Sequence, residues 1–372
     1  MKVMLLTNFI PPYRKALYKA MQTKFELKIG ISVVMEENRQ WIADDADLNV
    51  VRHKTLTLKQ SWKHAKGFKE PMYVHLPLDA YFHIAEYRPD ILISGELGFR
   101  TVMAVLYKKM NPKCKFVIWA TLSEFSEIGK GRFRNWLRKK LLLRADGIIV
   151  NGNSGEKYIR SLVPDVPRIE KVPYVCDTTA FLNLPINETQ TNERRLIYVG
   201  QLVERKGLVQ FMKILIRWCE KHSGNVIQFN VVGDGPLKKI LERMPYPANL
   251  RVDFLGFKSY ENIQTLYSNA ELMIFPSLAD EWGLVVNEAM LAGIPVMGSV
   301  YAQAVTELTQ DGFNGWQFKP DDSTDVYNAL DKALSLSRDK LREMGIAARK
   351  STQHMDCDWA ADKIKSFLEA IQ

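Results

Sequence analysis

Short apolar segments rich in branched side chains recur along the whole chain and alternate with amphipathic segments. An apolar run of four to eight residues indicates a buried strand, whereas apolar residues spaced three and four apart indicate a helix. Their alternation predicts βαβ units, in which helices cover both faces of a parallel sheet. Twelve strands are expected, six in each half: 3–7, 27–32, 91–95, 116–121, 147–151 and 169–175, then 196–200, 229–233, 252–256, 272–277, 295–298 and 316–318.

Two sets of six strands predict two Rossmann-like domains, each built on a doubly wound parallel sheet. A chain of 372 residues is also too long for one ordinary domain of this kind. The polar, aperiodic segment 184–193 is expected to link a first domain, residues 1–183, to a second, residues 194–354. Residues 355–372 have a helical pattern after the second sheet is complete, and we expect this helix to pack back toward the first domain.

The net charge of +9 is unevenly distributed. Residues 1–190 hold 30 Lys and Arg against 19 Asp and Glu, whereas the rest of the chain holds 21 against 23. The first half is therefore expected to meet an anionic partner. Neither the four cysteines nor the six histidines have the spacing of metal ligands, so no metal and no cofactor are expected.

No apolar run approaches the length of a membrane-spanning helix, and the first residues lack the cleavage region of a signal peptide. A cytoplasmic location is therefore expected. The stretch 130–144, KGRFRNWLRKKLLLR, combines seven basic residues with an apolar stripe of Phe133, Trp136, Leu137 and Leu141. It is either a surface helix of the first domain or an element that docks peripherally on an anionic membrane, and the two interpretations are compatible.

The most informative stretch is 272–293, LMIFPSLADEWGLVVNEAMLAG. A buried strand leads through a loop and a glycine into a helix, whose free N–H groups form an anion site at the carboxyl end of the strand. Gly283 lets a phosphate approach the backbone closely. Glu288, little more than one turn into the helix, is placed to bind ribose hydroxyls, and Asp280 to reach a group beyond the phosphates. The stretch therefore predicts a nucleotide-sugar site.

These residues resemble the signature of glycosyltransferase family 4, a retaining family with the GT-B fold. The family has a Glu, seven residues and a second Glu, set between a Pro-Ser strand end and a Gly-Leu-Val-Val helix. This chain has Asp280 and Glu288 at that interval, with Asp in place of the first Glu. The shorter side chain bears on the identity of the sugar more than on the chemistry. Segments 198–207, 232–236 and 254–257 also resemble the family's donor domain, and the resemblance covers residues 195–372.

The resemblance implies glycosyl transfer from a nucleotide diphosphate-sugar, with retention of anomeric configuration and without a metal ion. It implies Asp280, Glu288 and Lys206 as catalytic residues. Lys206 and Arg205 would hold the leaving diphosphate together with the start of the helix. Substrate contacts are expected from residues at strand ends in both domains: Arg205, Gly207, Gly256, Phe257, Trp282, Gly283, Leu284, Val285, Asn8 and Gly95.

The sequence thus predicts a retaining glycosyltransferase that acts on a glycan or a lipid-linked acceptor in cell-surface polysaccharide synthesis. It leaves open the sugar, the nucleotide, the acceptor, the linkage and the oligomeric state. One alternative is a sugar-nucleotide epimerase of the same fold, which would turn over the donor without an acceptor. Another is a basic nucleic-acid-binding protein, although no binding module and no stacking pattern of aromatic residues is present.

Overall fold

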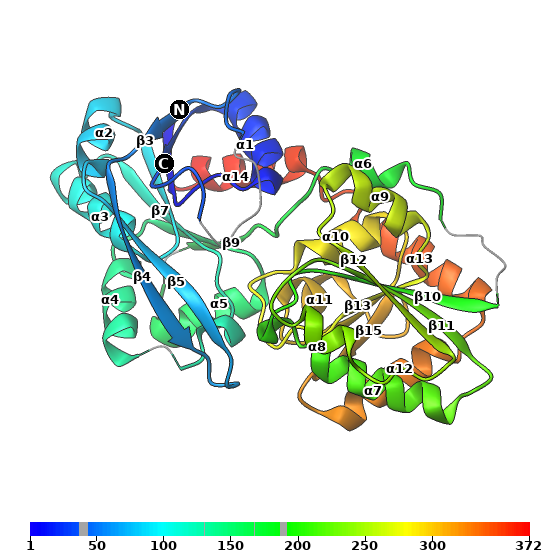
Figure 1. The fold of residues 1–372 in the computed structure, drawn as a ribbon. Helices are drawn as coiled ribbons and strands as arrows, with labels where there is room; N and C mark the ends of the chain where they lie inside the picture. Colours follow the sequence, from blue (N-terminus) through cyan, green and yellow to red (C-terminus); the bar gives the residue numbers. More distant parts are fainter. Residues whose placement is uncertain (37–43, 130, 167, 187–191) are drawn as a thin grey trace. The chain divides into compact units, whose positions relative to one another are not determined.

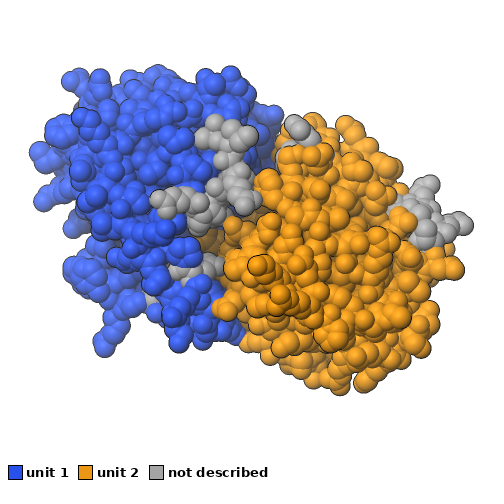
Figure 2. All heavy atoms as spheres, in the orientation of Figure 1, with its two compact units in different colours: residues 1–176, 356–372 blue, residues 177–355 orange. Residues whose placement is uncertain are grey.

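The computed structural model of the protein divides into two compact units, drawn in different colours in Figure 2. Unit 1 comprises residues 1–176 and 356–372, and unit 2 comprises residues 177–355. The structure describes the chain except residues 37–43, 130, 167 and 187–191. The middle of the predicted linker and the first residue of the basic stretch 130–144 therefore lie outside the described residues.

Unit 1 contains a parallel sheet of seven strands in the order β3-β2-β1-β6-β7-β8-β9 (Figure 1). These strands are β1 (Lys2–Thr7), β2 (Glu26–Ile31), β3 (Val50–Arg52), β6 (Ile91–Gly95), β7 (Lys115–Ala120), β8 (Gly147–Val150) and β9 (Arg168–Lys171). Two further strands, β4 (Thr55–Lys63) and β5 (Lys69–Pro77), form a separate antiparallel hairpin. The helices are α1 (Pro12–Lys24), α2 (Ala80–Tyr87), α3 (Phe99–Met110), α4 (Arg132–Leu142), α5 (Asn153–Leu162) and α14 (Cys357–Glu369), with a 3-10 turn at Phe125–Glu127.

Unit 2 contains a parallel sheet of six strands in the order β12-β11-β10-β13-β14-β15. The strands are β10 (Glu193–Val199), β11 (Val226–Val232), β12 (Leu250–Gly256), β13 (Leu272–Phe275), β14 (Val296–Ser299) and β15 (Gly315–Phe318). The helices are α6 (Thr179–Leu182), α7 (Leu208–Lys221), α8 (Lys238–Glu242), α9 (Tyr260–Ser268), α10 (Leu284–Leu291), α11 (Gln303–Leu308), α12 (Ser323–Leu334) and α13 (Arg338–Thr352), with a 3-10 turn at Glu204–Lys206.

All twelve predicted strands are present and parallel, so the prediction of two doubly wound parallel sheets is confirmed. The sequence did not predict β3 or the β4–β5 hairpin. Strand β3 has only three residues, and most side chains of β4 are exposed on both faces. Neither strand therefore carries the apolar run or the alternation from which a strand is recognised.

The order of strands reverses direction in the middle of each sheet. The reversal lies between β1 and β6 in unit 1 and between β10 and β13 in unit 2. Loops at the carboxyl ends of two such strands leave in opposite directions, so a crevice opens between them, and ligands of doubly wound proteins bind there. The strand order therefore predicts a crevice at the reversal of each sheet, where side chains from segments far apart in the chain can meet.

The C-terminal helix α14 belongs to unit 1 and packs against α1. The Lys24 ammonium lies 2.9 Å from the Asp362 carboxylate, which links the two helices. Helix α14 also covers β8, where a Cβ atom at Gly147 would lie 2.6 Å from the Phe367 ring. The last helix thus packs on the first unit, as the sequence predicted.

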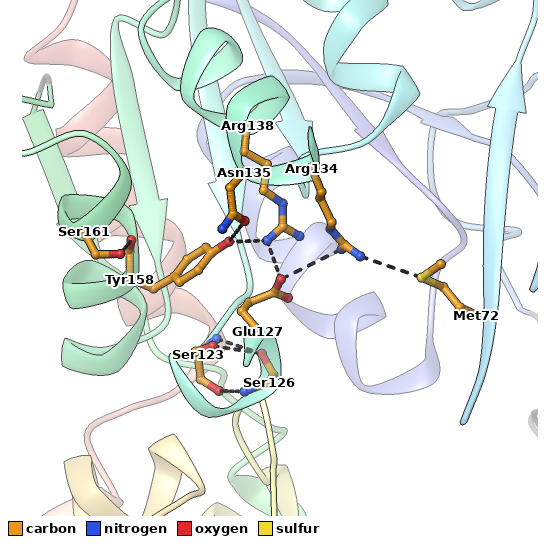
Figure 3. Close-up of polar contacts among 9 residues, drawn as sticks. All are labelled: Met72, Ser123, Ser126, Glu127, Arg134, Asn135, Arg138, Tyr158 and Ser161. Carbon is orange, nitrogen blue, oxygen red and sulfur yellow. Dashed lines mark hydrogen bonds and ion pairs between the residues drawn. The ribbon is translucent and has the colours of Figure 1, made fainter. Parts of the chain in front are cut away.

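A buried charged cluster fixes α4 to the rest of unit 1 (Figure 3). Arg138, only 2% exposed, pairs with the buried carboxylate of Glu127 and donates a hydrogen bond of 2.5 Å to the Tyr158 hydroxyl. The Arg134 guanidinium approaches the same carboxylate to 4.0 Å. Buried charges are tolerated only when they are paired and hydrogen-bonded. Arg138 is therefore part of the interior, although the sequence analysis had placed it among the basic residues around the apolar stripe, which were expected to face solvent or lipid.

We predict that Glu127→Ala lowers the free energy of unfolding by about 3–5 kcal/mol, because the Arg138 guanidinium would stay buried without a counter-charge. Urea unfolding measures the loss. The double variant Glu127→Gln/Arg138→Met removes both charges and should recover most of it. A loss below about 1 kcal/mol in the single variant, the ordinary value of an exposed ion pair, would contradict this role.

Candidate active site

The loops that follow β10 and β13 meet at the reversal of strand order in unit 2. A backbone hydrogen bond of 2.8 Å joins the two loops. A Cβ atom at Gly207, where φ is +67°, would lie 2.2 Å from the carbonyl oxygen of Pro276. Only glycine allows this approach. The contact brings Arg205 and Lys206, from the first loop, to Asp280 on the second.

Asp280 is held between the two cations that the sequence assigned to the diphosphate. The Lys206 ammonium donates a hydrogen bond to Oδ2, and a guanidinium nitrogen of Arg205 lies 3.6 Å from the same oxygen. The hydroxyl of Ser277 donates to it at 3.2 Å. Burial by itself would raise the pKa of the Asp280 carboxyl, but the charges of Lys206 and Arg205 hold that pKa below its usual value. An anionic ligand at this point would therefore compete with Asp280 for both cations.

Helix α10 starts directly after Gly283, which has φ of +103°. A Cβ atom there would lie 2.8 Å from the Phe275 ring, so a side chain would disturb the turn. Within the described part of the chain, no side chain caps this end of the helix. The backbone N–H groups of Leu284 and Val285 are therefore available at the point where the sequence predicts an anion site.

The Trp282 side chain is buried, and its indole N–H donates to the Asn287 side chain at 2.8 Å. This bond ties the residue just before Gly283 to the first turn of α10. A substrate contact of Trp282 in this conformation can therefore come only from its backbone.

Glu288 lies one turn after Leu284, the first residue of α10, and is 8% exposed. Its Oε2 accepts a hydrogen bond of 3.0 Å from the hydroxyl of Tyr267 on α9. Burial raises the pKa of the Glu288 carboxyl to about 7, and the bond from Tyr267 only partly opposes this shift. The carboxyl is thus poised between its two protonation states, and further hydroxyl donors would favour the ionised one. Tyr267 was not found from the sequence, because a tyrosine within the amphipathic pattern of α9 reads as a core residue.

Gly256 and Phe257 lie at the carboxyl end of β12, on the same edge of the sheet as the loops described above. Gly256 has φ of +66°, and its carbonyl accepts the Gly233 N–H at 2.9 Å. The Phe257 ring is half exposed. This pair therefore offers an irregular backbone and an aromatic face beside the crevice.

In unit 1, Arg100 brings together the two predicted residues Asn8 and Gly95. Its guanidinium donates to the Asn8 side-chain oxygen and, at 3.0 Å, to the Gly95 carbonyl. Arg100 is buried at the start of α3 and was not predicted as a site residue. It fixes the loops after β1 and β6, the strands between which the order reverses.

A pocket opens at this reversal, and its wall includes Asn8, Gly95, Arg14 and Trp119. The buried Arg14 guanidinium lies 4.7 Å from the centre of the Trp119 ring and 3.8 Å from that of Tyr174. Nη1 of Arg14 and Nε1 of Trp119 are buried, and neither has a hydrogen-bond partner among the described residues. Unsatisfied buried donors cost free energy, which a ligand with oxygen acceptors would recover.

Residues 183–351 match the family model of group 1 glycosyl transferases. This range covers nearly all of unit 2. An uncharacterized glycosyltransferase of Methanocaldococcus jannaschii is 28% identical over 148 residues, which are 39% of this chain and 37% of that protein.

A Campylobacter jejuni protein matches over a longer range, with 24% identity over 254 residues, 68% of this chain and 67% of its own. It is named GalNAc-alpha-(1->4)-GalNAc-alpha-(1->3)-diNAcBac-PP-undecaprenol alpha-1,4-N-acetyl-D-galactosaminyltransferase. For three other curated relatives the match spans only 35–37% of their length. The family match and these names support a transferase enzyme.

Among solved structures, Anabaena HepE in complex with UDP has a TM-score of 0.74 at 16% identity, and the match covers 100% of both chains. A likeness at this identity shows the fold, which is GT-B, as the sequence predicted. No helix in the described residues is long and apolar enough to cross a membrane.

The raised pKa of Glu288 leads to a prediction for the ligand-free protein. A carboxyl whose pKa is raised by folding stabilises the protein below its unfolded pKa, and this stabilisation is lost as the pH rises through the folded value. Relative to Glu288→Gln, the free energy of unfolding of the wild type should therefore fall by about 3 kcal/mol between pH 4.5 and pH 8. Urea unfolding across this range measures the difference, with Glu220→Gln on the exposed face of α7 as the control for loss of a carboxylate. Parallel curves for wild type and Glu288→Gln would contradict the prediction.

Proposed function

We propose that the protein is a retaining glycosyltransferase of family 4, which transfers a sugar from a nucleotide diphosphate-sugar to a glycan or lipid-linked acceptor. The observation that carries the proposal is the meeting of Lys206 and Arg205 with Asp280 beside the start of α10, at the reversal of strand order. Two cations and free helix N–H groups form a site for a diphosphate. The family match and the solved structures titled with UDP and UDP-glucose support a nucleotide-sugar as the donor.

The diphosphate of the donor would draw Lys206 and Arg205 away from Asp280. The freed carboxylate of Asp280 then accepts hydrogen bonds from hydroxyls of the sugar. As the bond to the sugar breaks, negative charge grows on the departing diphosphate, and the two cations and the N–H groups of Leu284 and Val285 stabilise it. These groups supply the positive charge for this step, so the transfer needs no metal ion.

Glu288 fixes the nucleoside end of the donor. Two ribose hydroxyls that donate to its carboxylate add to the bond from Tyr267 and favour the ionised form. The pKa of Glu288 should therefore fall when the donor binds. Gly256 and Phe257 border the base.

The acceptor would enter the pocket of unit 1, where Arg14 and Trp119 present donors without partners. An acceptor with anionic oxygens, such as a lipid-linked diphosphate saccharide, suits a guanidinium held over two aromatic rings. The name of the Campylobacter relative, which includes a PP-undecaprenol group, supports this class of acceptor. A role in cell-surface polysaccharide synthesis follows from such an acceptor.

A lipid-linked acceptor places the protein at a membrane, and α4 offers a face for contact with it. Phe133 is 75% exposed and Trp136 is 55% exposed. Their rings are stacked, with the ring centres 5.8 Å apart. Lys139 and Lys140 are exposed on the same helix. We call these four residues the membrane face. Exposed aromatic residues beside lysines are typical of helices that lie on anionic lipid.

The activity is tested first with a thermal-shift screen of UDP-, GDP- and dTDP-sugars, since a bound donor raises the melting temperature. The donor found should then transfer its sugar to a diphosphate-linked lipid saccharide in excess EDTA. Turnover of the donor without an acceptor would favour an epimerase. Stabilisation by none of these nucleotide-sugars would contradict the proposal.

Lys206→Ala should weaken binding of the nucleoside diphosphate by about 1.5–3 kcal/mol, roughly 10- to 150-fold in Kd, because a charge-assisted contact is lost. Binding of the free nucleoside should hardly change. Calorimetry with both ligands measures this, and Lys213→Ala, at an exposed position of α7, is the matched control. Equal losses for the two ligands would show that Lys206 does not contact the diphosphate.

The membrane face predicts binding to vesicles that contain anionic lipid, and this binding should weaken as salt rises. Replacing Lys139 and Lys140 by Gln removes about 2 kcal/mol of attraction to the anionic surface, and Phe133→Ser with Trp136→Ser removes the aromatic contacts. The fourfold variant carries all four of these changes. Sedimentation with neutral and anionic vesicles compares it with the wild type and with the control variant Lys213→Gln/Lys239→Gln. Equal binding to both lipids, or full binding by the fourfold variant, would leave α4 without this role.

A further inference from the structure

Three potential metal ligands converge where the β4–β5 hairpin joins the sheet of unit 1. His53 follows β3 directly, Asp79 precedes α2, and His83 lies in the first turn of that helix. Asp79 Oδ1 is 3.4 Å from His53 Nδ1, and Asp79 Oδ2 is 3.5 Å from His83 Nε2. One ligand atom from each residue lies within 4.8 Å of the other two.

His53 is buried, yet neither ring nitrogen makes a hydrogen bond within the described residues. Its Nε2 lies beside Gly30, where a Cβ atom would come within 2.5 Å of this nitrogen, so glycine leaves the space for the ring. Nδ1 is turned toward the cluster and lies close to Asp79 without bonding to it.

Asp79 is oriented by its neighbours as metal-binding carboxylates are. The backbone N–H of Lys54 donates to both of its carboxylate oxygens, at 3.0 and 3.1 Å. Such outer contacts fix the direction of a ligand and raise the affinity of a site. The carboxylate is therefore already aimed between the two imidazoles before any ion binds.

The geometry points to a site for one zinc ion bound by His53, Asp79 and His83. Ligands 2.0 Å from a tetrahedral zinc ion lie about 3.3 Å from one another. Each imidazole lies about this far from one oxygen of Asp79, and small shifts of the side chains would bring one atom of each residue, now within 4.8 Å of one another, to this spacing. Two imidazoles and one carboxylate are a ligand set that zinc accepts. The side chains of Asp79 and His83 are partly exposed, so water can reach the fourth position.

The ion would close the base of the β4–β5 hairpin. His53 lies just before β4 and Asp79 just after β5, and the register pairs Thr55 with Pro77 next to them. A hairpin of two strands alone is marginally stable. A zinc ion would tie both of its ends to α2, in the unit that does not hold the predicted donor residues.

The test is a titration of the metal-free, untagged full-length protein with Co²⁺, followed through its visible absorption, and then with Zn²⁺ by calorimetry. The wild type should bind one equivalent, and Zn²⁺ should raise its melting temperature. His83→Gln, at a partly exposed position, should lose at least about tenfold in affinity. His222→Gln is the matched control. His222 also lies near a carboxylate, 3.6 Å from Asp331, but that ion pair does not include a second histidine.

Retained one-equivalent binding in His222→Gln with loss in His83→Gln supports the site. Asp79→Asn provides a second variant, in which the amide oxygen can still accept the Lys54 N–H while the ligand charge is removed. Binding in His83→Gln that equals the wild type would overturn the proposal, and so would a wild type that binds no equivalent. Binding through the cysteines is covered by the first of these outcomes, since His83→Gln keeps all four.

Discussion

The reversal of strand order between β10 and β13 is the constraint on which the candidate active site depends. The loops that follow these strands diverge, yet the two loops must meet for Asp280 to reach Lys206 and Arg205. Gly207 allows this meeting, because any side chain there would collide with the Pro276 carbonyl. The ion pairs of Asp280 with Lys206 and Arg205 then hold the two loops together in the ligand-free protein.

The two acidic residues of the family signature lie in opposite environments although both are buried. Asp280 faces two cations, which lower its pKa, whereas Glu288 faces a tyrosine hydroxyl, and burial raises its pKa. Groups whose environments drive their pKa values apart are suited to different tasks. The lowered pKa of Asp280 favours its ionised form, in which it pairs with Lys206 and Arg205. Glu288, with a pKa of about 7, lies between its two protonation states, and hydroxyl donors that bind there would favour the ionised one, which would couple its ionisation to occupation of the site.

The sequence predicted those features whose signal is local. The twelve buried strands each carry an apolar run, and the stretch 272–293 contains strand, turn and helix start in one segment. Contacts between distant segments could not be predicted in this way. Tyr267 meets Glu288 only through packing of α9 on α10, and His53 meets His83 only because a hairpin of exposed strands returns the chain to the end of β3. Neither partner can be recognised from spacing.

The same limit applies to the basic excess of the first half, which the sequence assigned to an anionic partner. The structure divides these cations into two groups. Arg138 and Arg100 are buried and satisfied largely within the protein, by Glu127, Tyr158, Asn8 and Gly95, and they hold elements of unit 1 in place. Lys139 and Lys140 face solvent, and Arg14 is buried with one donor unsatisfied at a pocket. Arg138 and Arg100 each also keep a buried Nε without a hydrogen-bond partner among the described residues, so Arg14 differs from them by its place in the wall of a pocket. Net charge therefore predicts only that the first half of the chain meets an anionic partner, whereas burial and hydrogen bonding decide which cations are available to one.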